Sequence, residues 1–357
     1  MHIESLGYSV YLDDSLQSLQ KFIKESSYTK VFVLVDINTG EHCLPLLQQK
    51  LPDFTSFDII EIDPGEENKN IDFCIGVWST LIDFGADRKS LLINLGGGVV
   101  TDMGGFAAST FKRGFDFVHV PTTLLSQVDA SVGGKTGIDM NEIKNVIGTF
   151  TQPKAVFICT EFLNTLVERE WRSGFAEMIK HGLIRDIMFY NLLKNKSFSE
   201  IGQEEIRHSI YLKNQVVMED PKEMNLRKIL NFGHTIGHAL EGYSLTRGSN
   251  PLLHGEAIAV GMICEAYISH KSTGLSQESL EDITQYILSQ YPKDTLPAIN
   301  VSQDSLEEYL RIMKNDKKNE GSAIGFALLK EIGQAEPSVF VEEDLIKESI
   351  LYYNQLQ

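Results

Sequence analysis

Three histidines in one short window of the sequence have the residue type and spacing of a metal site. His234 and His238 stand four residues apart, so on an α-helix their side chains project from the same face. His254 follows a polar stretch and opens a second run with helical spacing, which could bring a third imidazole to the first two. Neutral imidazoles together with a carboxylate bind catalytic Zn²⁺ or a similar divalent ion. The window therefore predicts a catalytic metal centre.

The window does not supply its own complete ligand set. A buried histidine is more often a core residue hydrogen-bonded to the backbone, but three of the chain's nine histidines lie here beside Glu241 and Glu256. The segment HTIGH lacks the glutamate of H-E-x-x-H, which excludes the zinc protease interpretation. We therefore expect a carboxylate ligand from elsewhere in the chain. Helical spacing alone leaves His234 and His238 as equivalent candidates.

The secondary structure that must position these residues changes along the chain from alternating strands and helices to mainly helices. Buried-strand patterns occur at 30–38, 91–95 and 115–120, with a shorter strand after residue 57 and a helix expected after Asn68. From about Phe162 nearly every segment has helical spacing. We therefore predict an α/β domain over residues 1–161 and a mainly helical domain over residues 162–357.

A glycine-rich turn follows the strand that ends at Leu95, and a helix of small residues begins near Val99. Glycines at such a junction let backbone N–H groups approach a pyrophosphate at a helix N-terminus. The fingerprint G-x-G-x-x-G requires glycine at position 101, where this chain has Thr101. The match is partial, and an ordinary tight turn remains an equal alternative.

Polar side chains and glycines dominate the segment after residue 120, which we expect to be a long functional loop. It offers hydroxyl, carboxylate, ammonium and amide groups suited to a phosphorylated polyol, namely Thr122, Thr123, Asp129, Lys135, Lys144 and Asn145. Solvated surface is the alternative. In the helical half, Glu177 and Lys180 stand three apart among apolar residues, where a carboxylate is unfavourable unless it is paired or metal-bound. A surface ion pair is the alternative there.

Composition narrows the function classes. The formal charge of −17 over 357 residues argues against a general binder of nucleic acid or anionic membranes. Residues 1–15 lack a signal-peptide pattern and no apolar run is long enough to span a bilayer, so we expect a cytoplasmic protein. The four cysteines form no C-x-x-C pair and are expected to be reduced core thiols, at Cys43, Cys74, Cys159 and Cys264.

Taken together, these residues resemble the 3-dehydroquinate synthase family of the sugar-phosphate cyclase superfamily. The resemblance extends from about Asp36 to Gly333 and rests on motifs in a fixed order: PGEENK, GGGVVTD, KRG, PTTLLSQVDASVGGKTGI, GFAEMIKHGLI, LNFGHTIGHALE, HGEAIAVGM and NDKKN. It implies a Rossmann-like NAD-binding domain followed by a mainly α-helical metal- and substrate-binding domain. It also implies NAD and one divalent metal ion, Zn²⁺ or Co²⁺, as cofactors, and a homodimer.

The activity implied by the resemblance is that of a carbon–oxygen lyase of the shikimate pathway. The family converts 3-deoxy-D-arabino-heptulosonate 7-phosphate to 3-dehydroquinate and phosphate. The steps are transient oxidation at C5, elimination of phosphate, re-reduction, ring opening and intramolecular aldol closure. NAD⁺ is regenerated in each turnover and acts as a catalyst.

The resemblance also implies a role for each site residue. The metal ligands would be Glu177, His234 and His254, and His238 would act beside the metal as an acid/base group. Positions that hold NAD match Asp36, Glu66, Lys69, Gly97, Gly98, Val99, Asp102, Thr122 and Thr123, with Asp129, Lys135 and Lys144 close to both cofactor and substrate. The substrate set adds Arg113, Asn145, Lys180, Lys213, Arg227 and Asn231, and one lysine of the pair Lys317 and Lys318 completes it.

Three other functions remain open. Another sugar-phosphate cyclase would share most of these motifs, although Asn231, His238 and the segment Asp316 to Lys318 favour the dehydroquinate reaction. A metal-dependent polyol dehydrogenase also joins an NAD-binding half to a helical metal-binding half, so fold alone does not exclude it. A regulator that binds nucleotide or metal without catalysis is the third possibility.

Overall fold

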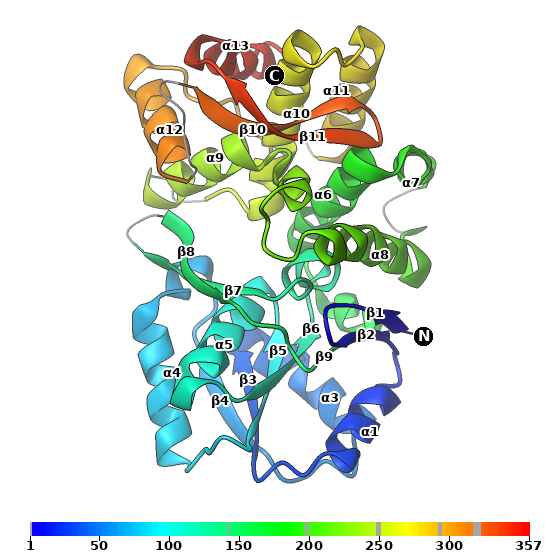
Figure 1. Cartoon of the computed structure of the whole chain (residues 1–357), viewed down its shortest axis with the longest axis vertical. Helices are drawn as coiled ribbons and strands as arrows, with labels where there is room; N and C mark the ends of the chain where they lie inside the picture. The colour runs from blue at the N-terminus through cyan, green and yellow to red at the C-terminus, as the bar shows by residue number, and fades with distance from the viewer. Residues whose placement is uncertain (1, 141–142, 197–199, 248–250, 292–294, 317–322) are drawn as a thin grey trace. The chain divides into compact units, whose positions relative to one another are not determined.

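The chain forms two compact units, Met1–Trp171 and Arg172–Gln357, in a computed structural model that describes residues 2–140, 143–196, 200–247, 251–291, 295–316 and 323–357 (Figure 1). The boundary that the sequence predicts, after residue 161, falls inside the 3-10 helix η4 (Thr160–Thr165). Phe162 of that helix is buried in the core of the first unit, which therefore extends beyond the predicted boundary.

The first unit contains a seven-stranded sheet in the order β1-β2-β9-β6-β5-β3-β4. Neighbouring strands are parallel except for β1 and β2, which are antiparallel. The strands are β1 (His2–Glu4), β2 (Ser9–Leu12), β3 (Val31–Asp36), β4 (Asp58–Ile62), β5 (Leu91–Gly96), β6 (Asp116–Pro121) and β9 (Ala155–Ile158). The predicted strands at 30–38, 91–95 and 115–120 are confirmed, whereas β1 and β2 are too short to give a strong sequence pattern.

Helices cover both faces of this sheet. They are α1 (Gln17–Glu25), α2 (Ile37–His42), α3 (Leu44–Lys50), α4 (Ile71–Asp83) and α5 (Gly98–Thr110), with short 3-10 turns η1 (Glu66–Asn68) and η2 (Phe111–Arg113). The predicted helix after Asn68 is α4, which begins where the Asn70 side chain accepts hydrogen bonds from the backbone N–H groups of Asp72 and Phe73.

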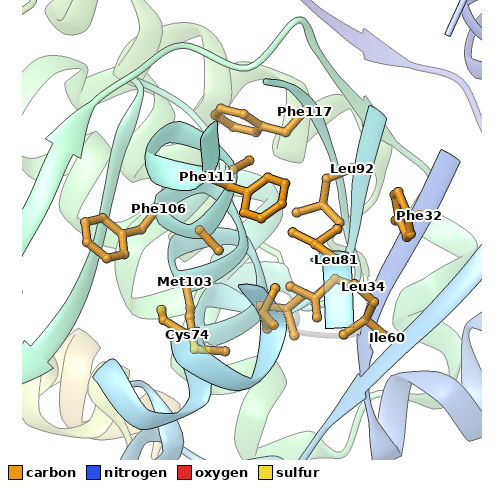
Figure 2. Close-up of a cluster of buried hydrophobic side chains, with 14 of the residues drawn as sticks. Phe32, Leu34, Ile60, Cys74, Leu81, Leu92, Met103, Phe106, Phe111 and Phe117 are labelled. Carbon is orange, nitrogen blue, oxygen red and sulfur yellow. The ribbon is translucent and has the colours of Figure 1, made fainter. Parts of the chain in front are cut away.

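Successive side chains of each strand point to opposite faces of the sheet, so the core of the first unit consists of two clusters, one on each face. Phe32 and Leu34 on β3 point to one face of the sheet, and Val33 and Val35 point to the other. Figure 2 shows the first cluster, in which strand side chains meet helix side chains such as Met103 of α5. A sheet buried on both faces explains why its strands read as continuous apolar runs.

The predicted long loop after residue 120 is largely regular structure. The segment begins with a short π-helix, η3 (Ser126–Ala130), and continues as an antiparallel pair of strands, β7 (Lys135–Met140) and β8 (Ile143–Phe150). The loop prediction was wrong because apolar residues such as Val146 and Phe150 lie on the exposed side of β8, while polar residues lie among its partly buried positions, so the usual alternation is missing. Gly137 and Gly148 pair across the two strands, where a side chain would meet the opposite backbone.

The second unit is mainly helical, as predicted. Its elements are α6 (Glu168–Arg185), which begins just before the division, α7 (Ile187–Lys194), α8 (Gln203–Glu219), the 3-10 turn η6 (Leu226–Asn231), α9 (His234–Arg247), α10 (His254–Ser272), α11 (Gln277–Gln290), α12 (Gln303–Asp316), the hairpin β10 (Ile324–Glu331) and β11 (Gln334–Val341), and α13 (Glu343–Asn354). Helix α10 is buried along almost its whole length, as expected of a helix with apolar residues on every face.

Two further sequence expectations concern side-chain chemistry and hydropathy. All four cysteines are buried and free, which confirms the prediction of core thiols. Among the described residues, no helix combines the length and the apolar character that crossing a membrane requires.

Candidate metal and nucleotide sites

Glycines let three helices of the second unit approach one another at backbone distance. A Cβ atom at Gly261 of α10 would overlap the carbonyl oxygen of Gly233, the residue just before α9. A Cβ atom at Gly255, near the start of α10, would likewise overlap the backbone of Ser173 on α6. Only glycine permits these contacts. They bring the start of α9 against the middle of α10, and the first turn of α10 against the second turn of α6.

This packing converges one carboxylate and two imidazoles. The Oε1 atom of Glu177 lies 3.6 Å from Nε2 of His234 and 3.5 Å from Nε2 of His254. The ligand atoms of all three side chains lie within 4.8 Å of one another. Glu177 is fully buried, whereas the His254 side chain is 21% exposed and leaves the group accessible from one side.

Hydrogen bonds on the far side of each ring orient the two imidazoles. Nδ1 of His234 lies 3.1 Å from the carbonyl oxygen of Phe232, and Nδ1 of His254 lies 3.2 Å from Oε2 of Glu241. Because both partners accept hydrogen bonds, each Nδ1 carries a proton in these contacts and each Nε2 can present its lone pair. Metal-binding histidines are held in this way in other proteins. The donor set therefore fits a divalent ion such as Zn²⁺ or Co²⁺.

Local charges act differently on the two rings. Burial lowers the pKa of His234 well below its usual value, and the nearby Lys180 ammonium lowers it further. Burial also disfavours protonated His254, but the carboxylates of Glu241 and Glu177 outweigh burial and raise its pKa to about 9. Because a ligand imidazole must be deprotonated, binding of a divalent ion would compete with protonation of this ring.

Lys180 completes the surroundings of Glu177. The Lys180 ammonium pairs with Oε2 of Glu177, and the two side chains are 1% and 0% exposed. This burial excludes the surface ion pair that the sequence left open. A buried carboxylate between an ammonium and two imidazoles is well placed to bind a cation, because the surrounding apolar atoms strengthen its field.

The structure separates the two histidines of α9. The ring centroid of His238 lies 5.0 Å from that of His234 and 5.8 Å from that of His254. His234 faces Glu177, whereas His238 gathers with Glu241 and His254 in a second group of possible ligands. The structure thus places His234 in the group that contains the buried Glu177, with His238 one turn further along the helix.

Two further cationic candidates of the second unit are buried. Lys213 lies on α8, one turn after Ser209, whose Oγ lies 2.8 Å from Nδ1 of His181 on α6. Lys213 is 6% exposed and Arg227 is 1% exposed, so both positive charges are buried. Lys317 and Lys318 lie outside the described residues.

A carboxylate organises the turn that carries Arg227. Asp220 accepts hydrogen bonds from the backbone N–H groups of Asn225 and Arg227, at 2.7 and 3.1 Å. The Arg227 guanidinium donates to the carbonyl oxygen of Pro221 at 2.8 Å. Asn231, at the end of η6, donates from Nδ2 to Glu223.

In the first unit, the candidate nucleotide residues follow neighbouring parallel strands. Asp36 ends β3, the segment Gly97 to Val99 follows β5, and Thr122 and Thr123 follow β6. Because β6, β5 and β3 are adjacent, these residues share the carboxyl edge of the sheet. Ligands of open α/β sheets bind at this edge.

The glycine turn leaves the N-terminus of α5 without a side-chain cap. Gly97 is the N-cap residue of α5 and provides no side-chain cap, and a Cβ atom there would lie 2.9 Å from Cγ2 of Thr123. The backbone N–H groups of a helix of this length form an anion site. Asp36 ends the neighbouring strand β3, where its Oδ1 accepts a hydrogen bond from the Thr39 N–H at 2.7 Å. An acidic residue at this edge is the type that binds ribose hydroxyls. These features fit a dinucleotide.

Thr101 explains the partial glycine fingerprint. It is buried, and its hydroxyl lies 3.2 Å from the carbonyl oxygen of Gly97 and from Oγ of Ser126. The close helix-to-strand approach that the third glycine of the fingerprint usually permits is provided here by Gly104. A Cβ atom at Gly104 would overlap the Asn94 side chain on β5.

A network of charged side chains joins α5 to the β7–β8 hairpin. Nζ of Lys69, which is 3% exposed, donates to Oδ2 of Asp102 at 2.7 Å and to Oδ1 of Asn145 at 2.6 Å. Nζ of Lys144 lies 2.8 Å from Oε1 of Glu66. Five of the predicted residues thus meet, although they come from three separate segments of the chain.

Asp139 is a member of this network that the sequence did not reveal. Its carboxylate accepts a hydrogen bond from the backbone N–H of Asn145 at 2.7 Å and so supports the left-handed conformation of that residue (φ 53°). Burial raises the pKa of Asp139 to about 6, with the Glu66 carboxylate adding to the shift. No local pattern marks Asp139, because its partner lies on the opposite strand of the hairpin.

Arg113 does not join the other candidates of the first unit. It is exposed, follows the C-terminal end of α5 and precedes β6, so it lies toward the amino edge of the sheet. The 13 residues of α5 separate it from Gly98 by about 20 Å. Asp129 lies in η3 and is partly buried, and Lys135 is exposed at the start of β7.

Comparison with known proteins gives the same family for both units. The chain matches the 3-dehydroquinate synthase N-terminal family over residues 59–173 and the 3-dehydroquinate synthase C-terminal family over residues 174–319. It is 42% identical over 355 residues to the 3-dehydroquinate synthase of Parabacteroides distasonis, with 97% of each chain covered. It is 38% identical over 354 residues to that of Bacillus pumilus, with 96% of this chain and 94% of the relative covered.

Solved structures of related cyclases share the fold. A 2-deoxy-scyllo-inosose synthase complexed with carbaglucose-6-phosphate, NAD⁺ and Co²⁺ superposes with a TM-score of 0.84 and 25% identity, covering 98% of this chain and 99% of that one. A structure described as a probable glycerol dehydrogenase from Sinorhizobium meliloti is more distant, with a TM-score of 0.65 and 14% identity over 99% of this chain and 98% of that one, and shares the fold alone. On the full-length similarity to curated relatives, the chain belongs to the 3-dehydroquinate synthase family.

Proposed function

We propose that this chain converts 3-deoxy-D-arabino-heptulosonate 7-phosphate to 3-dehydroquinate and phosphate, as a carbon–oxygen lyase without net oxidation. The observation that carries the proposal is the group of Glu177, His234 and His254, oriented by hydrogen bonds, in a chain of this family. The 2-deoxy-scyllo-inosose synthase and the probable glycerol dehydrogenase match the chain at 25% and 14% identity, against 42% for the 3-dehydroquinate synthase of Parabacteroides distasonis.

NAD would be held at the carboxyl edge of the first unit's sheet. The backbone N–H groups at Gly97 to Val99 would bind the pyrophosphate, and Asp36 would bind ribose hydroxyls. The chemistry that a bound NAD would supply at this edge is reversible hydride transfer, with no net oxidation over a turnover. The buried Lys69, paired with Asp102, would keep this edge rigid.

The metal ion would be held by Glu177, His234 and His254. The chemistry that a bound ion would supply there is Lewis-acid activation of a hydroxyl and a carbonyl of the substrate. His238, one turn from His234, would hold or transfer a proton on the substrate. Its position beside the ligands and outside the Glu177 group suits that role.

Positive side chains would hold the two anionic groups of the substrate. Lys180, Lys213 and Arg227 are buried cations of the second unit, so each is weakly screened by water. Lysine and arginine fix carboxylate and phosphate groups by charge-assisted hydrogen bonds. Such fixed contacts restrict the substrate to geometries from which phosphate can leave.

We also propose a homodimer. Arg113 matches a substrate position of the family but lies toward the opposite edge of the sheet from the glycine turn. A second copy of the chain could bring its own Arg113 to that position. Light scattering of the purified protein tests the assembly, and a monomer that is fully active would contradict it.

Redox balance tests the function directly. Purified protein given NAD⁺, a divalent metal and the heptulosonate phosphate should release phosphate without accumulating NADH. A polyol dehydrogenase would instead form NADH in proportion to product. Phosphate release only from a sugar phosphate that lacks the carboxylate would replace the proposal with another cyclase activity.

A further inference from the structure

The N-terminus of α9 receives a hydrogen-bonding cap from another helix. The residue before His234 is Gly233, which has no side chain and has a positive φ of 81°. The carboxylate of Glu265, on α10, accepts a hydrogen bond from the backbone N–H of Gly233 at 2.7 Å and one from Ile236 at 3.1 Å. Glu265 thus replaces an N-cap side chain, which normally accepts hydrogen bonds from the free N–H groups of the first turn.

Burial makes this arrangement more than a surface contact. Glu265 is 0% exposed and lies on a helix that is otherwise buried among apolar residues. A carboxylate is strongly disfavoured there unless hydrogen bonds and positive charge compensate it. The N–H groups and the positive end of the α9 dipole supply both. Removing the carboxylate would leave those N–H groups buried without this acceptor.

The backbone that Glu265 holds is the backbone that aims His234. Glu265 binds the N–H of the residue before His234 and that of the second residue after it. The His234 ring is itself fixed by the carbonyl oxygen of Phe232, in the same turn. A shift of this turn would therefore move Nε2 of His234 away from Glu177.

We propose that Glu265 is a positioning residue that sets the metal-binding geometry of His234 by clamping the first turn of α9. This inference rests on the metal centre of the proposed function. It assigns no contact between Glu265 and the metal or the substrate. Its consequence is that metal affinity depends on a side chain outside the ligand set.

The test compares metal affinity in variants of two buried caps. Glu265→Ala removes the clamp, and Glu265→Gln keeps the shape but replaces one acceptor oxygen by a donor. Glu205→Gln is the matched control, because Glu205 is 8% exposed and accepts a hydrogen bond from the Gly202 N–H at the start of α8, at 2.9 Å. Each full-length protein is titrated with Zn²⁺ against a chelator, and the absorption spectrum of the Co²⁺ form is recorded.

We expect Glu265→Ala to weaken Zn²⁺ binding by about 10- to 100-fold, the usual effect of losing a residue that orients a ligand. Glu265→Gln should fall between this variant and the wild type, and both should alter the Co²⁺ spectrum. Glu205→Gln should lower the melting temperature without changing affinity or spectrum. NAD⁺ affinity, which depends on the first unit, should be unchanged in all three.

Two different failures can be told apart. If the wild-type protein binds neither Zn²⁺ nor Co²⁺, the proposed metal centre is refuted. If the wild type binds metal and both Glu265 variants bind it equally well, the positioning role is refuted and the metal centre stands. Should Glu265→Ala not fold, Glu265→Gln decides: a weakened affinity supports the role and an unchanged one overturns it.

Discussion

Exchanging the two histidines of α9 for alanine should have opposite consequences for metal binding. His234→Ala removes the imidazole whose Nε2 lies 3.6 Å from Oε1 of Glu177. Four-ligand zinc sites bind with about 10–16 kcal/mol, so one ligand contributes about 2.5–4 kcal/mol. That range corresponds to a loss of about 10²- to 10³-fold in affinity. The variant should therefore be purified largely without metal.

His238→Ala should retain its ion. The His238 ring lies outside the group formed by Glu177, His234 and His254, so we expect the affinity to stay within about threefold of the wild type, a change below 1 kcal/mol. Turnover should nevertheless fall by about 10²- to 10⁴-fold, because the variant lacks the proton-transfer group. NAD⁺ affinity should not change in either variant.

The assay is elemental analysis of protein purified without chelator, followed by competition titration with Zn²⁺. His254→Ala serves as the positive control, because its imidazole faces the same Glu177 oxygen. The reasoning would be refuted if His238→Ala were the metal-free protein and His234→Ala kept its ion. The ion would then use the second group, formed by His238, Glu241 and His254.

Three further predictions follow from the same structure. Glu241→Gln should weaken Zn²⁺ binding by about 10- to 100-fold in the same titration, because Glu241 orients His254. Gly261→Ala should lower the melting temperature and the metal content, because its Cβ would overlap Gly233. Gly76→Ala, on the exposed side of α4, is the control: it should raise the free energy of unfolding by about 0.5–1 kcal/mol in chemical denaturation, because the added Cβ meets nothing within 4 Å. Asp139→Asn should raise the free energy of unfolding at neutral pH by about 1–3 kcal/mol. The pKa of Asp139 in the folded protein is raised to about 6, so the wild type loses stability as this carboxyl ionises, and asparagine cannot ionise. That gain, measured by denaturation at several pH values, should shrink as pH falls through 6 and vanish below about 4; a gain independent of pH would contradict it.

The sequence determined the elements and much of the chemistry. The apolar runs at β3, β5 and β6 predicted the strands that carry the nucleotide residues, because a parallel sheet buried on both faces leaves no polar alternation. The spacing of His234 and His238 placed them on one helical face, and the ordered motifs gave the family. The strands β7 and β8 were not predicted because their polar and apolar residues do not alternate between a buried and an exposed face: Val146 and Phe150 are exposed.

Only the tertiary structure decided which side chains meet. It placed His234 opposite Glu177, buried the Glu177 and Lys180 pair, and revealed Asp139 and Glu265 as carboxylates that hold other residues in place. Periodicity reports which face of a helix or strand is buried but not the element against which it is buried. The metal group depends on close approaches of α6, α9 and α10 at glycines, and these partners are distant in sequence, so local spacing contains no record of them.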